Sequence, residues 1–431
     1  MLNADMGKTF REWTPEQAVM FPASPMDFVG KEDLGPFIRS LVLEQLDLSE
    51  ILNQYQEERG YPPFHPAMMT AVLLYSYAQG IYSSRRIARA CKQRVDFLAL
   101  TGMQMPDHRT VNLFRQRHLK ALSGLFDQVL KLCGKAGLIK LGHVALDGTR
   151  IRANASKQKS MSYGSMKKAE DRLKAEVERW FAEAERIDRE EDELYGPDKS
   201  GDELPEWVSN KQERLKRIQQ AKAELEAEAK AEAQRGPDPD KTGHKPKPNG
   251  VPAEKTQRNL TDADSRIMKS GEIFLQGYNA QVAVDSHRQI IVAQSLTNSG
   301  SDMHQMIPLL KQIRRNLGRQ AQEASADSGY CSESNLKALV KRHIRGYVST
   351  SLHRKHRNVG RWVQRMRRRL AQGAQRSRYR LRKQTVEPTF GQIKECRGFR
   401  QFLMRGLDKV AGEWSLVCTA HNLLKLADAT A

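Results

Sequence analysis

The sequence lacks the features that mark membrane-spanning, secreted and cysteine-stabilised proteins. Its apolar runs are all shorter than the roughly 20 residues that a membrane helix needs, so we exclude a spanning protein. The first residues, MLNADMGKTFREW, contain no hydrophobic signal core, so we do not expect secretion by that route. The five cysteines are scattered without a CxxC pair, which argues against a disulfide framework and against a zinc ribbon. Aromatic residues make up only 7% of the chain, but 39% of it is hydrophobic, so we do not expect global disorder.

Acidic residues are also scarce relative to basic ones. The 431 residues include 71 Lys and Arg but 51 Asp and Glu, which gives a formal charge of +20. The excess is concentrated, because the 32 residues 352–383 hold 13 Lys or Arg and no acid, whereas residues 166–234 are mixed in sign and rich in Glu. Concentrated positive charge favours a polyanionic partner, namely DNA, RNA or an anionic membrane surface. A solvated basic surface without a partner is the alternative.

Residues 29–135 have the periodicity of helices, for example in LGPFIRSLVLEQL and PAMMTAVLLYSYAQG. Two further helices are predicted, in YSSRRIARACKQ with Ser83 or Ser84 as the N-cap and in MPDHRTVNLFRQRHLKAL with Asp107 as the N-cap. Together with the connecting VDFLALTG, these basic helices suggest a helix-turn-helix-like unit. An ordinary helical bundle fits the pattern equally well. The arginines that could contact phosphates are Arg85, Arg86, Arg109, Arg115 and Arg117.

A buried strand is predicted at HVALDGTRIRA, where the apolar run 144–146 ends at Asp147 and Gly148. Helical periodicity follows at once and predicts an inserted antiparallel helical hairpin with a turn at 196–205 and a flexible linker at 235–257. This hairpin could be a dimer interface, a DNA clamp or a spacer. Its two apolar stripes are Leu173, Val177, Trp180, Ala184 and Ile187, and Leu215, Ile218, Ala221, Leu225 and Ala229.

Strand patterns return after residue 272. FLQGYNAQVAVD and QIIVAQSLT predict a hairpin, a helix around 303–317 follows, and EASADSGY predicts a short strand ending at Asp327. A further helix, the strand RGYVST and a helix beginning near Thr385 complete the chain. Three antiparallel strands followed by α/β units fit an RNase H-like mixed sheet with helices on both sides, an α/β fold.

Three acids stand at distinctive places in this order. Asp147 and Asp327 end two predicted strands, and Glu387 lies in the first turn of the predicted helix TVEPTFG, where Pro388 is tolerated. Carboxylates from neighbouring strand ends and from a helix over that edge could hold two divalent metal ions, the arrangement that suits phosphodiester chemistry. We interpret Asp302, in NSGSDMHQM, as a helix cap in preference to a metal ligand.

Basic and aromatic side chains accompany these acids. Lys394 follows Glu387 by two helical turns and lies on nearly the same face, while Tyr379 and Arg382 precede it. Such groups could hold phosphates at a cut site. Arg150 follows Asp147 closely enough to contact DNA, and Arg380 belongs to the same basic stretch.

The segments VALDGTRIRANAS, NLTDADSRIM, GYNAQVAVD, ADSGY and YRLRKQTVEPTFGQIK together resemble bacterial insertion-sequence transposases of the DDE type. The resemblance is to the subgroup with a helical N-terminal domain, a long insertion after the first Asp and a Tyr-Arg-Glu-Lys signature. It implies a catalytic and metal-binding triad of Asp147, Asp327 and Glu387. The signature falls on Tyr379, Arg382, Glu387 and Lys394, with four residues between Arg and Glu where the usual pattern has three.

The resemblance implies an enzyme that cuts the ends of an insertion sequence and joins the 3′-hydroxyls to target DNA with Mg²⁺, for which Mn²⁺ could substitute. Its partners would be the terminal inverted repeats and target DNA, with a homodimer or larger assembly on DNA, in the cytoplasm and at the nucleoid. The expected division is a helical N-terminal domain at 1–135, the first part of the core at 136–160, an insertion at 161–257 and the remaining core at 258–431. A non-catalytic DNA-binding regulator and an RNase H-like nuclease without strand transfer remain the alternatives.

Overall fold

The computed structural model describes residues 25–30, 32–55, 62–195, 206–235, 250–351 and 360–430. The predicted hairpin turn at 196–205, most of the linker and the first residues of the basic stretch lie outside them. Within the described part of the chain, no helix is both long enough and apolar enough to cross a membrane.

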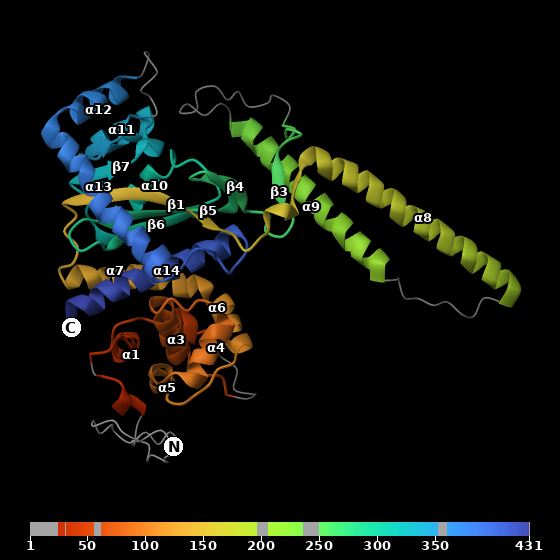
Figure 1. Ribbon diagram of the computed structural model, residues 1–431, viewed down its shortest axis with the longest axis horizontal. Coiled ribbons are helices and arrows are strands. Elements are labelled where there is room, and N and C mark those ends of the chain that lie inside the picture. The colour runs from red at the N-terminus through yellow and green to blue at the C-terminus, as the bar shows by residue number, and fades with distance from the viewer. Residues whose placement is uncertain are drawn as a thin grey trace, which may run out of the picture.

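The N-terminal part consists of helices packed around a buried central one. Nearly every residue of α3 is buried, since the other helices surround it. Its contacts with α1 and α14, together with those between α7 and α14, join the N-terminal helices to the rest of the molecule. Figure 1 shows α7 and α14 between these helices and the sheet. The elements are a 3₁₀ turn at Pro25–Phe28, α1 (Leu34–Glu44), α2 (Ser49–Leu52), α3 (Pro66–Ala78), α4 (Ser84–Gln93), α5 (Val95–Thr101), α6 (His108–Arg117) and α7 (Leu119–Lys135).

The N-cap predictions for this region are confirmed in position. Ser83 is the N-cap residue of α4, although its side chain makes no capping bond, and Asp107 caps α6 by accepting a hydrogen bond from the Thr110 N–H at 2.7 Å. The N-capping residue types alone therefore predicted where the two basic helices α4 and α6 begin.

The predicted RNase H-like mixed sheet is confirmed. The strands β1 (His143–Arg152), β5 (Ile273–Asp285) and β6 (Ile291–Thr297) are antiparallel neighbours, and β7 (Glu323–Ala326) and β8 (Arg345–Val348) continue the sheet in parallel with β1. The order is β4-β5-β1-β7-β8, with β6 also paired to β5. The strand β4 (Arg266–Ser270), which the sequence patterns did not indicate, pairs with the first residues of β5.

Helices cover the sheet. The helix α13 (Gly373–Gly391) contacts four strands, α14 (Leu407–Thr430) packs against β6 and α7, and α10 (Met306–Leu317) packs against β6. The helices α11 (Glu333–Lys341) and α12 (Arg361–Ala371) lie beside β8, and short 3₁₀ turns occur at Lys157–Lys159 and Ser328–Tyr330. One continuous hydrophobic core includes side chains from the N-terminal helices, the sheet and α14. The sheet is therefore buried between helices, as a mixed sheet with apolar strands requires.

Two predicted element boundaries are wrong. The strand β1 does not end at Asp147 but continues to Arg152, because the 13-residue β5 pairs with it over its whole length after Val144. The helix predicted to start near Thr385 instead begins at Gly373, so Glu387 and Pro388 lie near its end.

The interior position of Pro388 has a local explanation. Proline has no N–H to donate to the carbonyl four residues earlier, which is that of Gln384. That carbonyl instead accepts a hydrogen bond from the Gln289 side chain at 3.2 Å. A π-helical turn, Gln392–Cys396, follows α13 directly. The helix therefore tolerates an interior proline because a neighbouring side chain supplies the missing donor.

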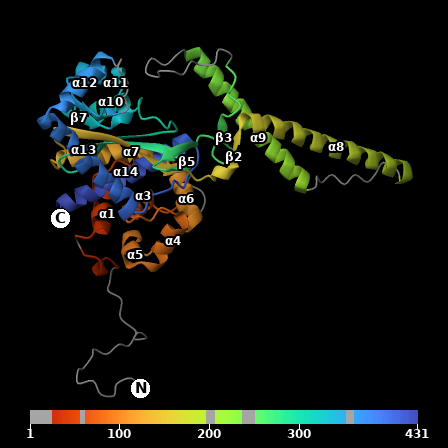
Figure 2. The same cartoon turned by 45° about the horizontal axis from the view of Figure 1, so that its top comes forward.

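Two long helices, α8 (Tyr163–Tyr195) and α9 (Glu206–Arg235), follow the first strand as an antiparallel pair. They project from the side of the molecule in Figures 1 and 2. With a rise of 1.5 Å per residue, α8 is about 50 Å long. A small second core near the base holds the pair together, and the two-stranded sheet of β2 (Ser160–Ser162) and β3 (Gln257–Asn259) ties it to the body. That core contains Tyr163, Met166, Leu173, Ile218, Ala221 and Leu225.

Candidate active site

The register of the sheet brings Asp147 and Asp327 together. The parallel ladder between β1 and β7 ends with Leu146 opposite Ala326. Asp147 and Asp327 are the next residues on the two neighbouring strands, so they stand side by side where the ladder opens. The Asp327 side chain accepts a hydrogen bond from the Gly329 N–H at 2.9 Å, which holds the chain in a tight turn after the strand.

Burial and mutual repulsion perturb both carboxyls. Burial above all, with the Asp327 and Asp302 carboxylates, raises the pKa of Asp147 to about 6, although the Arg382 guanidinium opposes this rise. Burial and the Asp302 carboxylate likewise raise the pKa of Asp327. Such a cluster of repelling acids is characteristic of functional sites, because a bound cation or proton relieves the repulsion.

The interpretation of Asp302 as a helix cap is wrong. Gln305, not Asp302, is the N-cap residue of α10, which starts three residues later than predicted. The Asp302 side chain is 8% exposed and turns to the acids instead: Oδ1 accepts hydrogen bonds from Asn279 and Gln281, both at 2.7 Å, and Oδ2 accepts one from Arg150 at 3.0 Å. The sequence suggested a cap because an Asp just before an apolar helical pattern usually is one.

Two glycines allow these side chains to crowd together. A Cβ atom on Gly148 would lie 2.1 Å from the Gln281 side-chain nitrogen and 2.9 Å from Asp302 Oδ1. A Cβ atom on Gly329 would lie 3.1 Å from both Asp302 Oδ2 and Asp327 Oδ1. Two atoms at 3.1 Å from one point are no more than twice that distance apart, so these two acids are close neighbours.

Three of the predicted phosphate-binding residues lie at the same place. Arg382 Nη1 donates to Asp147 Oδ2 at 2.5 Å, and its side chain is 13% exposed. Lys394 Nζ donates to Thr149 Oγ1 at 2.6 Å, while Arg150 Nη2 donates to the Gly300 carbonyl at 2.7 Å. Arg382 and Lys394 therefore approach β1 from α13 and from the π turn that follows it.

Tyr379 belongs to the same group through Arg382. Burial lowers the pKa of the Arg382 guanidinium, but the Asp147 carboxylate and the Tyr379 hydroxyl outweigh it and raise that pKa above its ordinary value. Tyr379 thus lies beside Arg382 on the preceding turn of α13. Burial also lowers the pKa of Lys394.

The structure does not bring Glu387 and Arg380 into this group. Both side chains are exposed on α13, and among the described residues neither makes a hydrogen bond or ion pair with the acids. Glu387 points away from the acids because it follows Arg382 by five residues on α13. Five residues turn a helical side chain by roughly 140°, so Glu387 lies on a different face of the helix from Arg382. The described ranges contain no group of three His, Cys, Asp or Glu side chains able to hold a metal ion together.

The donor chemistry that is present nevertheless fits a hard divalent cation. Asp147 and Asp327 offer carboxylate oxygens, the ligands that Mg²⁺ and Mn²⁺ accept, and two protein carboxylates are enough for a cation that keeps several waters. Burial and the neighbouring acids raise the pKa of both carboxyls in spite of the Arg382 guanidinium, so a bound cation would offset the cost of their ionisation.

A basic groove lies between α4 and α6. It has a volume of about 650 Å³, and Arg85, Arg109, Arg115 and Leu403 are among its lining residues. The prediction that Arg115 contacts phosphates is wrong, since it is 4% exposed and donates to the Tyr77 hydroxyl and the Tyr82 carbonyl. Arg115 therefore fixes α6 to its neighbours. Of the three arginines named in this groove, Arg85 and Arg109 are the exposed ones.

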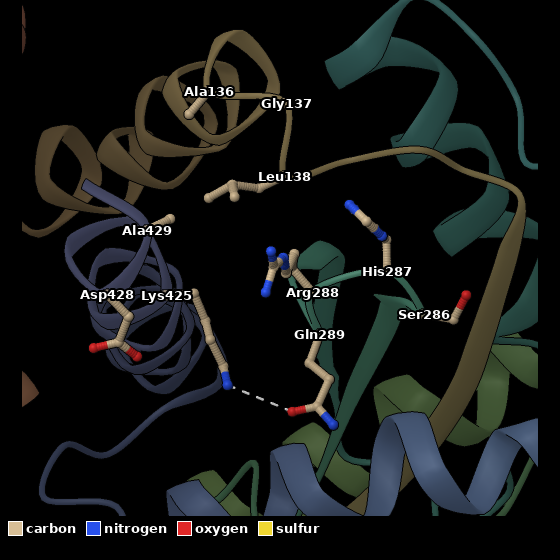
Figure 3. A pocket seen from close by; sticks show the side chains of 10 residues that line it. All are labelled: Ala136, Gly137, Leu138, Ser286, His287, Arg288, Gln289, Lys425, Asp428 and Ala429. Atoms are coloured by element: carbon tan, nitrogen blue, oxygen red, sulfur yellow. Dashed lines mark hydrogen bonds between the residues drawn. The ribbon is translucent and has the colours of Figure 1, made fainter. Parts of the chain in front are cut away.

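A second pocket, of about 640 Å³, lies at the end of the sheet where β1 begins (Figure 3). Its lining includes His287 and Arg288 from the turn between β5 and β6 and Lys425 and Asp428 of α14, and Lys425 Nζ donates to Gln289 Oε1 at 3.5 Å. The lining includes none of the acids of the cluster around Asp147. This pocket is therefore separate from the candidate active site.

Comparison with protein families gives two matches. The model described as "Transposase DDE domain" matches residues 243–423, and the model described as "Transposase domain (DUF772)" matches residues 25–117. The first range contains Asp302, Asp327, Glu387 and Lys394, whereas Asp147 precedes it. No curated protein and no solved structure matches the chain.

Proposed function

Since this chain belongs to the DDE transposases of insertion sequences, we propose that it cuts the ends of its own element and joins them to target DNA. The observation that carries the proposal is the pair of half-buried, mutually repelling carboxyls of Asp147 and Asp327 beside the Arg382 guanidinium. Neighbouring carboxylates can hold divalent cations, and an adjacent guanidinium can bind a phosphate. Together these groups suit the cleavage and joining of phosphodiester bonds.

The reaction would have two steps of the same kind. In the first, a water oxygen attacks the phosphorus at the element end, the bond from phosphorus to the 3′ oxygen breaks, and the element keeps a 3′-hydroxyl while the flank keeps a 5′-phosphate. In the second, this 3′-hydroxyl attacks a phosphorus of target DNA, and the target's bond to its own 3′ oxygen breaks. No covalent link to the protein is needed.

The acids would hold divalent cations, with Mg²⁺ as the proposed ion and Mn²⁺ as a substitute. The proposed ligands are Asp147 and Asp327, which follow the paired residues Leu146 and Ala326, and Glu387 on α13, which would join them in the DNA complex. When bound, such cations lower the cost of the negative charge that develops on the attacking and leaving oxygens.

The basic side chains would hold the phosphates. Arg382 and Arg150 present guanidinium groups next to the acids, and Lys394 lies beyond them at Thr149. A guanidinium matches the geometry of a phosphate because it donates in a fork, and Tyr379 would hold Arg382 in place for that contact. Arg380, exposed on the same helix, is proposed as a contact to the DNA backbone farther from the cut.

The N-terminal helices are proposed as a further DNA contact. Arg85, Arg86 and Arg89 are exposed on α4, and Arg109 is exposed at the start of α6 beside the same groove. We keep the division into a DNA-binding part at 1–135, a core at 136–160 and 258–431, and an insertion at 161–257 as part of this proposal. Because two ends must be cut in one assembly, the proposal includes a dimer or larger complex on paired ends.

The test uses labelled DNA carrying an element end, a target duplex and Mg²⁺. The wild-type protein is expected to nick the end and to form a joined product, whereas Asp147→Asn binds the same DNA without cutting it. Cut ends without joined product would indicate a nuclease, and a gel shift without nicking would indicate a regulator. Cleavage that persists in Asp147→Asn would refute the assigned site, and sedimentation that shows only monomers on paired ends would refute the dimer.

A further inference from the structure

Asp302 is a buried acid that the proposed chemistry does not use. It lies in the loop between β6 and α10, its residue is 6% exposed, and it is not the N-cap of the helix that follows. Burying a carboxylate is costly unless several donors satisfy it, and placing it near other carboxylates adds to that cost. We therefore expect the charge of Asp302 to make a contact that a neutral side chain could not make.

Its partners show which contact that is. Oδ1 accepts from the amides of Asn279 and Gln281, and an Asn at position 302 could accept those bonds equally well. Oδ2 accepts from Arg150 Nη2, and only this bond gains from a full negative charge. The amides fix the carboxylate, since Gln281 is in turn held by the Tyr330 hydroxyl.

Arg150 is well placed to act on DNA. It lies on β1, three residues after Asp147, and its side chain is 21% exposed. Within the described part of the chain, the two hydrogen bonds that its guanidinium donates both come from Nη2, to Gly300 and to Asp302. A guanidinium has five N–H donors, so its remaining donors can meet a phosphate.

We propose that Asp302 is a positioning residue that holds the Arg150 guanidinium beside Asp147 and Asp327, ready for a DNA phosphate. This inference rests on the proposed function for its substrate. Locking an arginine in its working geometry before DNA arrives avoids ordering a flexible side chain during the reaction. Asp302 itself would touch neither the cation nor the DNA.

The test is a double-mutant cycle with Asp302→Asn, Arg150→Ala and both together. Asn keeps the size of the side chain and its bonds to the two amides but loses the charge that holds Arg150. Two quantities are measured: the single-turnover rate of end cleavage with Mg²⁺, and the salt dependence of affinity for end DNA with Ca²⁺ in place of Mg²⁺. Glu254→Gln, which removes one charge from the exposed Lys167–Glu254 ion pair, is the matched control.

We expect Asp302→Asn to slow cleavage at least ten-fold without weakening DNA binding, because a negative charge near the DNA has been removed. In the Arg150→Ala background the same change is expected to cost less than two-fold. The slope of log affinity against log salt should fall by about one for Arg150→Ala, which loses one phosphate contact, and by part of that for Asp302→Asn, which loosens the same contact. The double variant should have the slope of Arg150→Ala, because Asp302 acts on the slope only through Arg150. Glu254→Gln should match the wild type throughout.

Equal losses from Asp302→Asn in both backgrounds would overturn the inference, since a purely structural residue would not depend on Arg150. If Asp302→Asn does not fold, Arg150→Lys takes its place: it keeps the charge but loses the fork, and cleavage at the wild-type rate would equally overturn the inference. A wild type that cuts no end DNA would refute the proposed function, while coupling in the salt slopes would still support the role of Asp302. If the wild type cuts end DNA but the losses from Asp302→Asn and Arg150→Ala simply add, the proposed function is supported and the role of Asp302 is refuted.

Discussion

Asp147→Asn should make the cation-free protein more stable while abolishing its activity. Burial and neighbouring acids raise the pKa of Asp147 from its ordinary value of 3.8 to about 6 in the folded protein. The folded state therefore binds this proton more tightly than the unfolded state, so stability is lost as the pH rises from about 4 to about 6. Each pH unit of that difference is worth about 1.4 kcal/mol, so the ionised carboxylate costs about 3 kcal/mol above pH 6.

Asn has the shape of the protonated acid and, like it, carries no charge. The variant should therefore gain about 2–3 kcal/mol in the free energy of unfolding at pH 7.5. Well below pH 4 the difference should vanish, because the wild-type carboxyl is then protonated in both the folded and the unfolded state. Urea unfolding in EDTA, followed by the fluorescence of the buried Trp414 on α14, measures this difference across the pH range. Asp171→Asn, at an exposed position of α8, is the control and should change little at any pH.

Divalent cations should reverse the ranking. Mn²⁺ is expected to stabilise the wild type more than Asp147→Asn, and this effect should fade as the pH drops through about 6 and protons compete for the carboxylate. An Asp147→Asn variant that is no more stable than the wild type at pH 7.5, or a stability difference that does not change with pH, would contradict the raised pKa of Asp147.

Three further substitutions test other parts of the argument. Gly148→Ala places a Cβ against the Gln281 side chain and should cost about 1–3 kcal/mol of stability, whereas an unchanged melting temperature would show that the cluster has room to spare. Arg115 also lowers the pKa of the fully buried Glu413, so Arg115→Met removes a cation close to that carboxyl and should cost about 3–5 kcal/mol in urea unfolding; a loss below 1 kcal/mol would contradict this stabilisation of Glu413. Glu387→Gln, at an exposed position, should leave stability within about 0.5 kcal/mol but abolish cleavage of end DNA, and full activity would remove Glu387 from the proposed ligands.

Local sequence signals predicted most of the elements because short-range physics decides them. Apolar periodicity identified the N-terminal helices and the strands of the core other than β4, and a capping Asp107 marked the start of α6. The order of these elements was enough for the RNase H-like sheet, since an antiparallel trio followed by α/β units has few ways to pair. The concentrated positive charge, together with the motif resemblance, indicated a DNA partner, and the family matches agree.

The tertiary structure alone decided how the site is assembled. Pairing register places Asp147 beside Asp327, and no local pattern specifies which residues of two distant strands stand opposite each other. Local sequence likewise could not place Asp302. It has the sequence position of a helix cap, but its loop lies against β1 and β5, where its side chain bonds to Arg150 and Asn279. Arg115 looked like a surface cation until neighbouring helices buried it, and α13 runs through Pro388 because a distant Gln289 supplies the missing donor. Periodicity reports what a residue does within its own helix or strand, whereas contacts between segments far apart in the chain depend on the packing of the whole molecule.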